Sequence, residues 1–184
     1  MEHPDDSRRF TAIYHACYPQ VYAYAVSRAG RDLAEDVAGD TFLTAWRRLD
    51  AIPPAPLPWL LGVARNMIRE RYRVEVRQAG ITTELRAWVE RTQAEADVAD
   101  GVAERAAMLD ALARLGDEDR ELLTLVAWHG LSTREAARVV GCSTATYFVR
   151  LHRARRRLEQ ALSGPPPAAA RRVPVPTQSQ ECTR

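Results

Sequence analysis

Apolar residues recur along most of this chain at intervals of three and four positions, which is the spacing of one face of an α-helix. Alternating runs of β-branched residues, which would indicate strands, are nearly absent. In the first part the spacing predicts three helices, over about 7–28, 32–49 and 58–73. Pro19 interrupts the first of them, so that segment is either two helices or one kinked helix. The predicted fold class is therefore all-α.

Capping signals define the ends of these three segments. Gly30 is expected to end the first helix. Asp32, with Glu35 three residues later, predicts an N-cap and a capping box for the second. The proline-rich segment 52–58 cannot be helix interior, and Pro58 suits the first turn of the third helix.

A second group of helices follows a polar, acidic stretch whose periodicity is weak. Four helices are expected there: 102–115, 117–128, a third that opens at Ser132 and ends at Gly141, and 144–162. Ser132 and Glu135 form a capping box at the start of the third, and Gly141 is expected to end it. Ser143 is the expected N-cap of the fourth.

These signals divide the chain into two small helical domains and two connecting or terminal segments. The domains are expected at 7–75 and 105–163, joined by a linker at 76–104 that includes a helical stretch near 83–95. Five of the eleven prolines lie after Gly164, so we expect the tail at 164–184 to be disordered.

Charge is distributed unevenly along the 184 residues, although the formal net charge is only +2. The segment 143–162 carries five arginines and a single acid, Glu159, which suggests a local site for a polyanion. The three cysteines are far apart and suggest reduced thiols in a cytosolic protein. The polar N-terminus and the lack of a long apolar run predict no signal peptide, no membrane insertion and a cytoplasmic location.

Residue types that carry catalysis do not form a recognisable group. The four histidines show no metal-ligand spacing, and neither a nucleophile–base pair nor a phosphate-binding glycine loop is evident. His129, beside Gly130, is interpreted as a helix-end residue. The sequence therefore predicts that the protein is not an enzyme and has no metal site, no cofactor and no small-molecule substrate.

The strongest pattern is the segment 131–157, in which two capped helices separated by a tight Gly-Cys-Ser turn predict a helix-turn-helix. The spacing directs four residues of its second helix inward: Tyr147, Leu151, Ala154 and Leu158. The opposite face would meet the major groove with Phe148, Val149, His152 and Arg153. Four arginines would neutralise phosphates: Arg150, Arg155, Arg156 and Arg157. The alternative is a solvated basic helix that closes an ordinary bundle.

This segment also carries a family resemblance. GLSTREAARVVGCSTATYFVRLHRARRRL, at 130–158, resembles the C-terminal domain of sigma-70 factors of the extracytoplasmic-function (ECF) branch, and 112–125 resembles the helix that leads into that domain. The segment 34–46 is similar to the acidic helix with which these factors grip the clamp helices of RNA polymerase. Trp59–Asn66 is similar to the segment that opens and reads the −10 promoter element.

The resemblance implies a sigma-2-like helical bundle, a sigma-4-like helix-turn-helix and a protein that directs core RNA polymerase to promoter DNA. An anti-sigma factor is expected as a further partner. The polymerase-binding residues implied are Asp32, Glu35, Asp36, Asp40 and Phe42. Those implied for the −10 element are Trp59, Arg65, Asn66, Arg69 and Arg73. Those implied for the −35 element are Thr144, Thr146, Phe148, Val149, Arg150, His152, Arg153, Arg155 and Arg156.

Elementary chemistry agrees with several of these roles. Asp36 and Asp40 lie four apart, hence on one helix face, and such a face suits a basic partner surface. Asn66 presents donors and an acceptor together and can discriminate a base edge. Trp46 and Trp59 are more typical of core residues than of base-stacking ones.

The chain departs from the family pattern at a few positions. Gly39 stands where the family usually has glutamine, and a glycine within a helix costs about 1 kcal/mol relative to alanine. Phe148 and Val149 replace a basic and a small polar residue, so an unusual −35 sequence is expected, read through thymine methyl groups. The proline-rich segment 52–58 replaces a polar loop that contacts bases in the family.

Two other functions remain open from the sequence. The chain could be a conventional transcription regulator that binds DNA through the helix-turn-helix without polymerase. It could also be a sigma-like protein that has lost initiation activity and acts as a decoy or partner-binding module.

Overall fold

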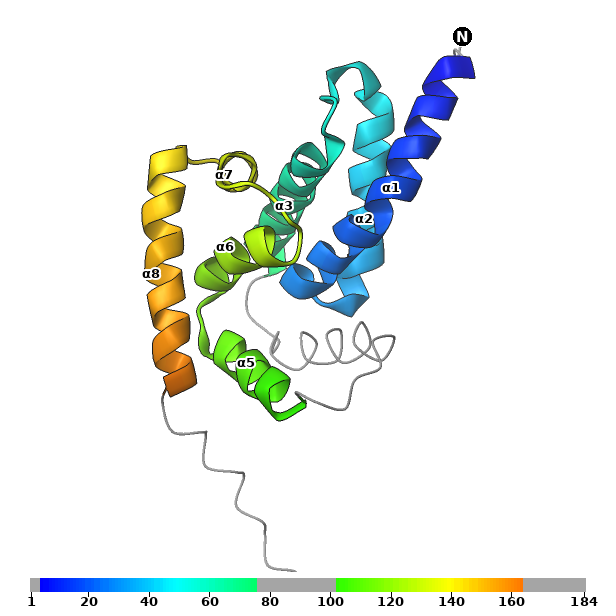
Figure 1. The fold of residues 1–184 in the computed structure, drawn as a ribbon. Coiled ribbons are helices and arrows are strands. Elements are labelled where there is room, and N and C mark those ends of the chain that lie inside the picture. Colours follow the sequence, from blue (N-terminus) through cyan, green and yellow to red (C-terminus); the bar gives the residue numbers. More distant parts are fainter. Residues whose placement is uncertain (1–3, 76–101, 164–184) are drawn as a thin grey trace, which may run out of the picture.

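The computed structural model describes residues 4–75 and 102–163, with side chains for 5–71 and 106–163, and this part of the chain is helical without strands. The predicted all-α class is confirmed (Figure 1). In chain order the elements are α1 (Pro4–Ala29), α2 (Arg31–Arg47), a 3-10 turn (Leu49–Ala51), α3 (Pro56–Glu75), α5 (Val102–Arg114), α6 (Asp117–Ala127), α7 (Thr133–Val140) and α8 (Thr144–Ser163). The predicted helical stretch near 83–95 and the tail at 164–184 lie outside the described residues.

The first three helices pack against one another and form the N-terminal bundle. Their core contains the fully buried side chains of Val21, Tyr24, Val37 and Leu60. Helix α1 continues through Pro19 as one helix, which decides between the two arrangements that the sequence left open.

The predicted cap of α2 is wrong. The helix begins at Arg31 with Gly30 as its N-cap, and no side chain caps it. Gly30 has φ 83°, and its N–H donates to the Val26 carbonyl at 3.0 Å. Only this one residue separates α1 from α2, so the left-handed glycine that ends the first helix also starts the second. Asp32 lies inside the first turn instead, where its carboxylate favours the positive end of the helix dipole.

Helix α3 begins at Pro56, two residues earlier than predicted. The preceding loop is held against α1 because the Arg9 guanidinium donates to the Ile52 carbonyl at 2.9 Å. Pro56 and Pro58 both occupy the first turn, where a missing N–H leaves no helical hydrogen bond unmade.

The C-terminal domain is a helix-turn-helix, α7 and α8, packed on α6, with α5 against α8. The capping box is confirmed, because Ser132 Oγ accepts from the Glu135 N–H at 3.3 Å and Glu135 Oε2 accepts from the Ser132 N–H at 2.9 Å. Gly141 ends α7 at φ 78°, and Ser143 Oγ accepts from the Thr146 N–H at 3.1 Å as the N-cap of α8. The local signals thus specify the turn of the motif.

Arg120 is a buried arginine that joins α5 to α6. Its guanidinium donates to the carbonyls of Leu112 at 3.0 Å and Leu115 at 2.8 Å, and to Asp117 Oδ1 at 2.9 Å. Leu112 lies in the last turn of α5 and Leu115 directly follows the helix, where few backbone N–H groups are available as partners. The Leu112 carbonyl also accepts from the Leu115 N–H at 3.2 Å, and Arg120 adds further donors to these carbonyls at the end of the helix.

The two domains pack against each other. Helix α3 lies beside α7 (Figure 1). A single cluster of buried apolar residues includes side chains of both domains. Leu61 of α3 is completely buried. One face of α3 therefore supports the N-terminal bundle and a second face supports the domain interface.

Cys17 is buried and Cys142 is half-buried, and both are free thiols, while Cys182 lies outside the described residues. Burial raises the pKa of the Cys17 thiol. None of the described helices combines the length and the apolar character that crossing a membrane requires.

A glycine-to-alanine substitution should have opposite effects on the free energy of unfolding in α2 and at the end of α7. Gly39 lies inside α2, and a Cβ there would meet nothing within 4 Å. We expect Gly39→Ala to raise the free energy of unfolding by about 1 kcal/mol, because alanine loses less backbone freedom in a helix. Urea titration monitored by circular dichroism measures it.

The matched control is Gly141→Ala, at φ 78°, which should lower the same free energy by about 1 kcal/mol. A loss of stability in Gly39→Ala would contradict the helical, solvent-facing position of that glycine.

Candidate polymerase and nucleic-acid interfaces

Helix α8 presents one face to the protein and one to solvent. Tyr147, Leu151 and Ala154 are buried, and the Tyr147 hydroxyl donates to the Leu122 carbonyl at 2.7 Å. On the other side the side chains of Phe148 and Val149 are 62% and 48% exposed. Two large apolar side chains at the exposed start of a basic helix are unusual for a surface that faces only water.

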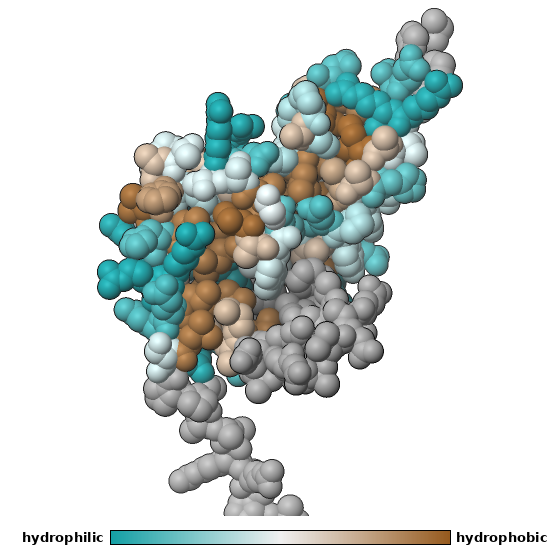
Figure 2. All heavy atoms as spheres, viewed as in Figure 1, coloured by the Kyte–Doolittle hydropathy of each residue, from teal (hydrophilic) through white to brown (hydrophobic). Residues whose placement is uncertain are grey.

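The other residues predicted at this surface are also solvent-accessible. Exposed side chains are those of Thr144, Thr146, His152, Arg153, Arg155 and Arg156. Thr146 Oγ1 shares a hydrogen bond of 2.8 Å with Ser143 Oγ, which fixes it at the first turn. In the space-filling view α8 runs from an apolar upper end to a hydrophilic lower part (Figure 2).

Two of the arginines already have partners in their own domain. Arg150 donates to Glu118 Oε2 at 2.9 Å, and Arg157 donates to Asp119 Oδ2. Both acids belong to the first turn of α6, where their negative charges interact favourably with the positive end of the helix dipole. Arg150, which the sequence placed among the DNA-binding residues, therefore lies on the side of α8 that faces α6.

Helix α3 holds the predicted −10 residues in different environments. Asn66 and Arg69 are exposed, and Trp59 is half-buried against the core. Arg73 lies within α3, but its side chain is outside the described set. Arg65 differs from its neighbours, because its side chain is only 13% exposed and faces the C-terminal domain.

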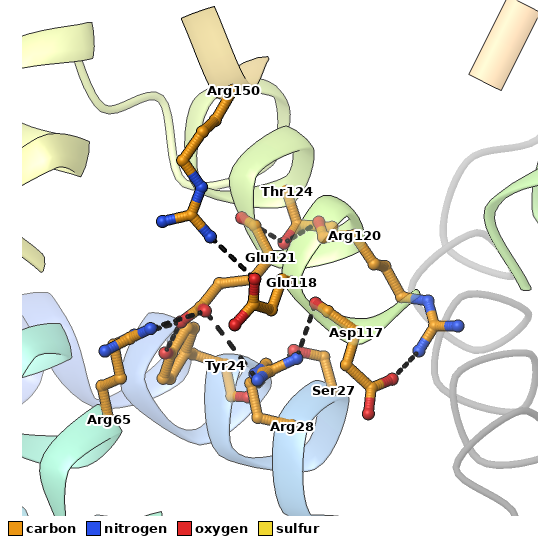
Figure 3. A network of polar contacts seen from close by, with 10 residues as sticks. All are labelled: Tyr24, Ser27, Arg28, Arg65, Asp117, Glu118, Arg120, Glu121, Thr124 and Arg150. Carbon is orange, nitrogen blue, oxygen red and sulfur yellow. Dashed lines mark hydrogen bonds and ion pairs between the residues drawn. The ribbon is translucent and has the colours of Figure 1, made fainter. Parts of the chain in front are cut away.

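Arg65 belongs to a polar cluster between the domains (Figure 3). At its centre is Glu121 of α6, which is 2% exposed. The carboxylate accepts from Arg65 Nε at 2.8 Å and Nη2 at 3.3 Å, and from the Tyr24 hydroxyl at 2.5 Å. Arg28 Nη2 lies 3.8 Å from it and Arg28 Nη1 donates to the Asp117 carbonyl at 2.9 Å. We call Tyr24, Arg28, Arg65 and Glu121 the interdomain cluster.

Burial and partners act in opposite directions on these groups. Burial raises the pKa of Glu121, but the charges of Arg28 and Arg65 and the hydrogen bonds from Arg65 and Tyr24 outweigh it, so the net pKa is lowered. Burial beside the Glu121 carboxylate raises the pKa of Tyr24 well above its usual value. Burial also lowers the pKa of His129, whose ring meets that of Tyr24 edge-on at 5.8 Å, to about 4. The centre of the interface thus holds an ionised carboxylate, a protonated phenol and a neutral imidazole at neutral pH.

The pairing of Glu121 with Tyr24 and Arg65 is not evident from the sequence. One sequence feature does indicate that Glu121 is buried. Thr124 and Leu125, three and four positions later, lie on the same face of α6 and are buried. Spacing can indicate that such a carboxylate is buried, but it cannot tell which other segment supplies the cation.

The acidic residues of α2 lie on an exposed surface. The side chains of Asp32, Glu35, Asp36 and Asp40 are all solvent-accessible. Arg71 of α3 donates to Asp40 Oδ2 at 2.6 Å and to Asp36 Oδ2 at 3.4 Å, so it joins the two carboxylates that the spacing placed together.

Phe42 does not belong to this surface. It is 3% exposed and its ring packs among those of Phe10, Tyr14 and Tyr18, with centroids at 6.4, 4.8 and 5.9 Å. Its assignment to the polymerase-binding residues is corrected here, because the N-terminal part of α1 covers it. Trp46, expected in the core, is half-buried with its ring 5.0 Å from that of Phe10.

In the part of the chain that the structure describes, no three histidine, cysteine or acidic side chains come together as a metal site. The fold and the surfaces on α8, α3 and α2 define an all-helical, helix-turn-helix protein with a basic surface and a separate acidic one.

Comparison with known proteins identifies the family. The model of sigma-70 region 2 matches residues 13–78, and that of sigma-70 region 4 matches residues 105–158. Together they cover more than half of the chain. The chain belongs to the sigma-70 family of RNA polymerase sigma factors, in its ECF branch.

Several named ECF sigma factors align with most of the chain. ECF sigma factor EcfG of Rhodopseudomonas palustris is 33% identical over 150 residues, which are 80% of this chain and 81% of the relative. SigL of Mycobacterium tuberculosis is 33% identical over 82% of this chain and 87% of its own length. BldN of Streptomyces coelicolor is 31% identical over 83% of this chain, and the match spans 60% of BldN.

Two solved structures share the fold. RpoE of Bartonella quintana, in complex with the anti-sigma factor NepR, aligns with a TM-score of 0.60 and 25% identity over 83% of this chain and 96% of that one. CnrH, in complex with the cytosolic domain of CnrY, aligns with a TM-score of 0.57 and 29% identity over 85% and 88%.

The different partners of the α8 arginines lead to a prediction about salt dependence. Arg156→Ala should weaken binding of a duplex carrying a −35 element, and should reduce the slope of log affinity against log salt by about 1, because one phosphate contact is lost. The double variant Glu118→Ala/Arg150→Ala should change the slope much less, since it removes a pair that is already internally neutralised. Fluorescence anisotropy at several salt concentrations measures both. Equal losses of slope would show that Arg150 binds a phosphate despite Glu118.

Proposed function

We propose that this chain initiates transcription as a sigma factor by binding core RNA polymerase through α2 and promoter DNA through α3 and α8. The observation that carries the proposal is the presence, in one chain, of both sigma regions in family order, with an exposed acidic face on the first and an exposed basic helix on the second. Sigma factors are regulatory DNA-binding proteins, and the polymerase supplies the catalytic chemistry. A cytoplasmic location follows from that partner.

The acidic side chains of α2 are the proposed polymerase contact. Asp32, Glu35, Asp36 and Asp40 are exposed along one helix and would attract a basic surface, which raises the association rate and fixes the register of docking. Arg71 holds Asp36 and Asp40 in place, so the carboxylates are presented with little loss of side-chain freedom.

The exposed part of α3 is the proposed reader of the −10 element. Asn66 can offer a base edge both a donor and an acceptor, while Arg69 neutralises a phosphate. Trp59 and Arg73 are assigned to the same surface by the family resemblance. Arg65 joins them only when it is released from Glu121.

Helix α8 is the proposed reader of the −35 element. Phe148 and Val149, on its exposed early turns, suit contact with thymine methyl groups in the major groove. Thr144, Thr146, His152 and Arg153 surround them. Arg155 and Arg156 supply phosphate contacts, for which neither has a competing partner among the described residues.

We extend the proposal to one further partner. RpoE and CnrH are solved in complex with NepR and with the cytosolic domain of CnrY, and the first of these is named an anti-sigma factor. An anti-sigma factor of this kind is therefore proposed for this chain too.

Transcription in vitro tests the function directly. Purified core RNA polymerase, with and without this protein, should give discrete protein-dependent transcripts from fragmented genomic DNA of its source. Binding to core without transcripts would favour a decoy, and specific duplex binding without core binding would favour a conventional regulator.

Two carboxylates test the docking face. Asp36→Asn/Asp40→Asn should weaken core binding by roughly tenfold, about 1.4 kcal/mol, because it removes two negative charges and leaves Arg71 uncompensated. Biolayer interferometry with immobilised core measures it. Asp50→Asn, an exposed acid after α2, is the control and should bind like the wild type. Unchanged affinity in the double variant would place the docking face elsewhere.

A further inference from the structure

The interdomain cluster joins the two domains through a single carboxylate. All the cationic and hydroxyl partners that the described structure gives to the Glu121 side chain come from the other domain: Tyr24 and Arg28 of α1 and Arg65 of α3 (Figure 3). Leu122 and Leu125, one and four positions after Glu121 in α6, are buried apolar residues of the same domain. An ionised carboxylate at 2% exposure is tolerable only when it is paired.

We call the arrangement in which the two domains pack against each other the closed form. The closed form is incompatible with simultaneous binding of the −10 and −35 elements. The −10 and −35 elements lie about 25 base pairs apart, which at about 3.4 Å per pair is roughly 85 Å along the helix axis. Here α3 contacts the C-terminal domain directly, and α8 packs on α6, the helix that carries Glu121. Packed helices are about 8–10 Å apart, so α3 and α8 cannot reach across such a distance without separation of the domains.

Glu121 also binds Arg65 in the way that a DNA phosphate would. Nε and Nη2 of the guanidinium both donate to the carboxylate, at 2.8 and 3.3 Å, and this fork is the geometry with which arginine binds phosphate oxygens. The Nε and Nη2 donors of Arg65 cannot bind the Glu121 carboxylate and a DNA phosphate at the same time. The face of α3 that carries Arg65 and Leu61, four positions apart, is at the same time covered by the C-terminal domain.

We propose that Glu121 is an internal competitor of promoter DNA for Arg65, so that the closed form is an autoinhibited state of the sigma factor. This inference rests on the proposed role of Arg65 at the −10 element. In the closed form Arg65 is withheld, and opening exposes both Arg65 and the covered face of α3. The binding of core polymerase and promoter must therefore supply the free energy of opening.

Glu121→Gln tests the closure without DNA or polymerase. It preserves the size of the side chain but removes its charge, and the closed–open equilibrium should shift toward the open form by roughly tenfold to a hundredfold. Small-angle X-ray scattering of the full chain should show a larger radius of gyration than the wild type. Glu159→Gln, which neutralises an exposed acid on α8, is the matched control and should leave the radius unchanged.

A second variant covers the case in which Glu121→Gln does not fold. Tyr24→Phe keeps the buried ring and removes only the hydroxyl that donates to Glu121, so it should expand the chain in the same direction and to a smaller extent. Circular dichroism verifies the helical content of each variant. An unchanged radius of gyration in folded Glu121→Gln, or in folded Tyr24→Phe should the first variant not fold, would overturn the proposal.

Transcription at limiting sigma concentration tests the competition itself. Because the apparent affinity is reduced by the fraction of competent molecules, Glu121→Gln should reach half-maximal transcription at a concentration roughly tenfold lower than the wild type. Expansion without this gain would show that Arg65 is not what closure withholds, and would overturn the competition while the wild-type transcripts preserve the proposed function. Absence of transcripts with the wild type would overturn both.

Discussion

The packing of the two domains depends on one buried carboxylate. The C-terminal domain supplies this carboxylate, and the N-terminal bundle supplies its partners. Glu121 can be ionised at this depth only because Arg28, Arg65 and the Tyr24 hydroxyl surround it, and all three belong to the N-terminal bundle. Separation of the domains would remove all three partners at once and leave the carboxylate unpaired, so these contacts form and separate together. Packing of α3 on α7 contributes buried area to the domain interface, and the interdomain cluster fixes how the two domains are aligned.

Pairing also determines which charges are available to partners. Arg150 and Arg157 are paired with acids of α6, and Arg65 is paired with Glu121. The proposed DNA-binding surface of α8 is consequently smaller and more apolar than the number of arginines suggests. In this proposal, specificity at the −35 element depends on Phe148 and Val149 to an unusual degree, and phosphate contacts come from the arginines that remain.

The features that could be predicted from the sequence are those encoded by neighbours along the chain. Helical periodicity gave the all-α class, and the capping box at Ser132 and the left-handed Gly141 gave the helix-turn-helix to within a residue. The cap at Asp32 failed because a one-residue connection at Gly30 leaves no place for it. Helical spacing places Phe42 on the inward face of its helix, and it is buried. The partner of Arg65 could not be predicted, since α6 supplies Glu121 from 56 positions away.

A sigma factor closed by Glu121 must open to engage a promoter, and an interdomain distance measures this opening. Energy transfer between one dye on α2 and one on α8 would be recorded for the chain alone, with core polymerase, and with core and promoter. We expect high transfer for the free chain and a loss of transfer in the promoter complex. Equally high transfer in a transcriptionally active promoter complex would contradict it.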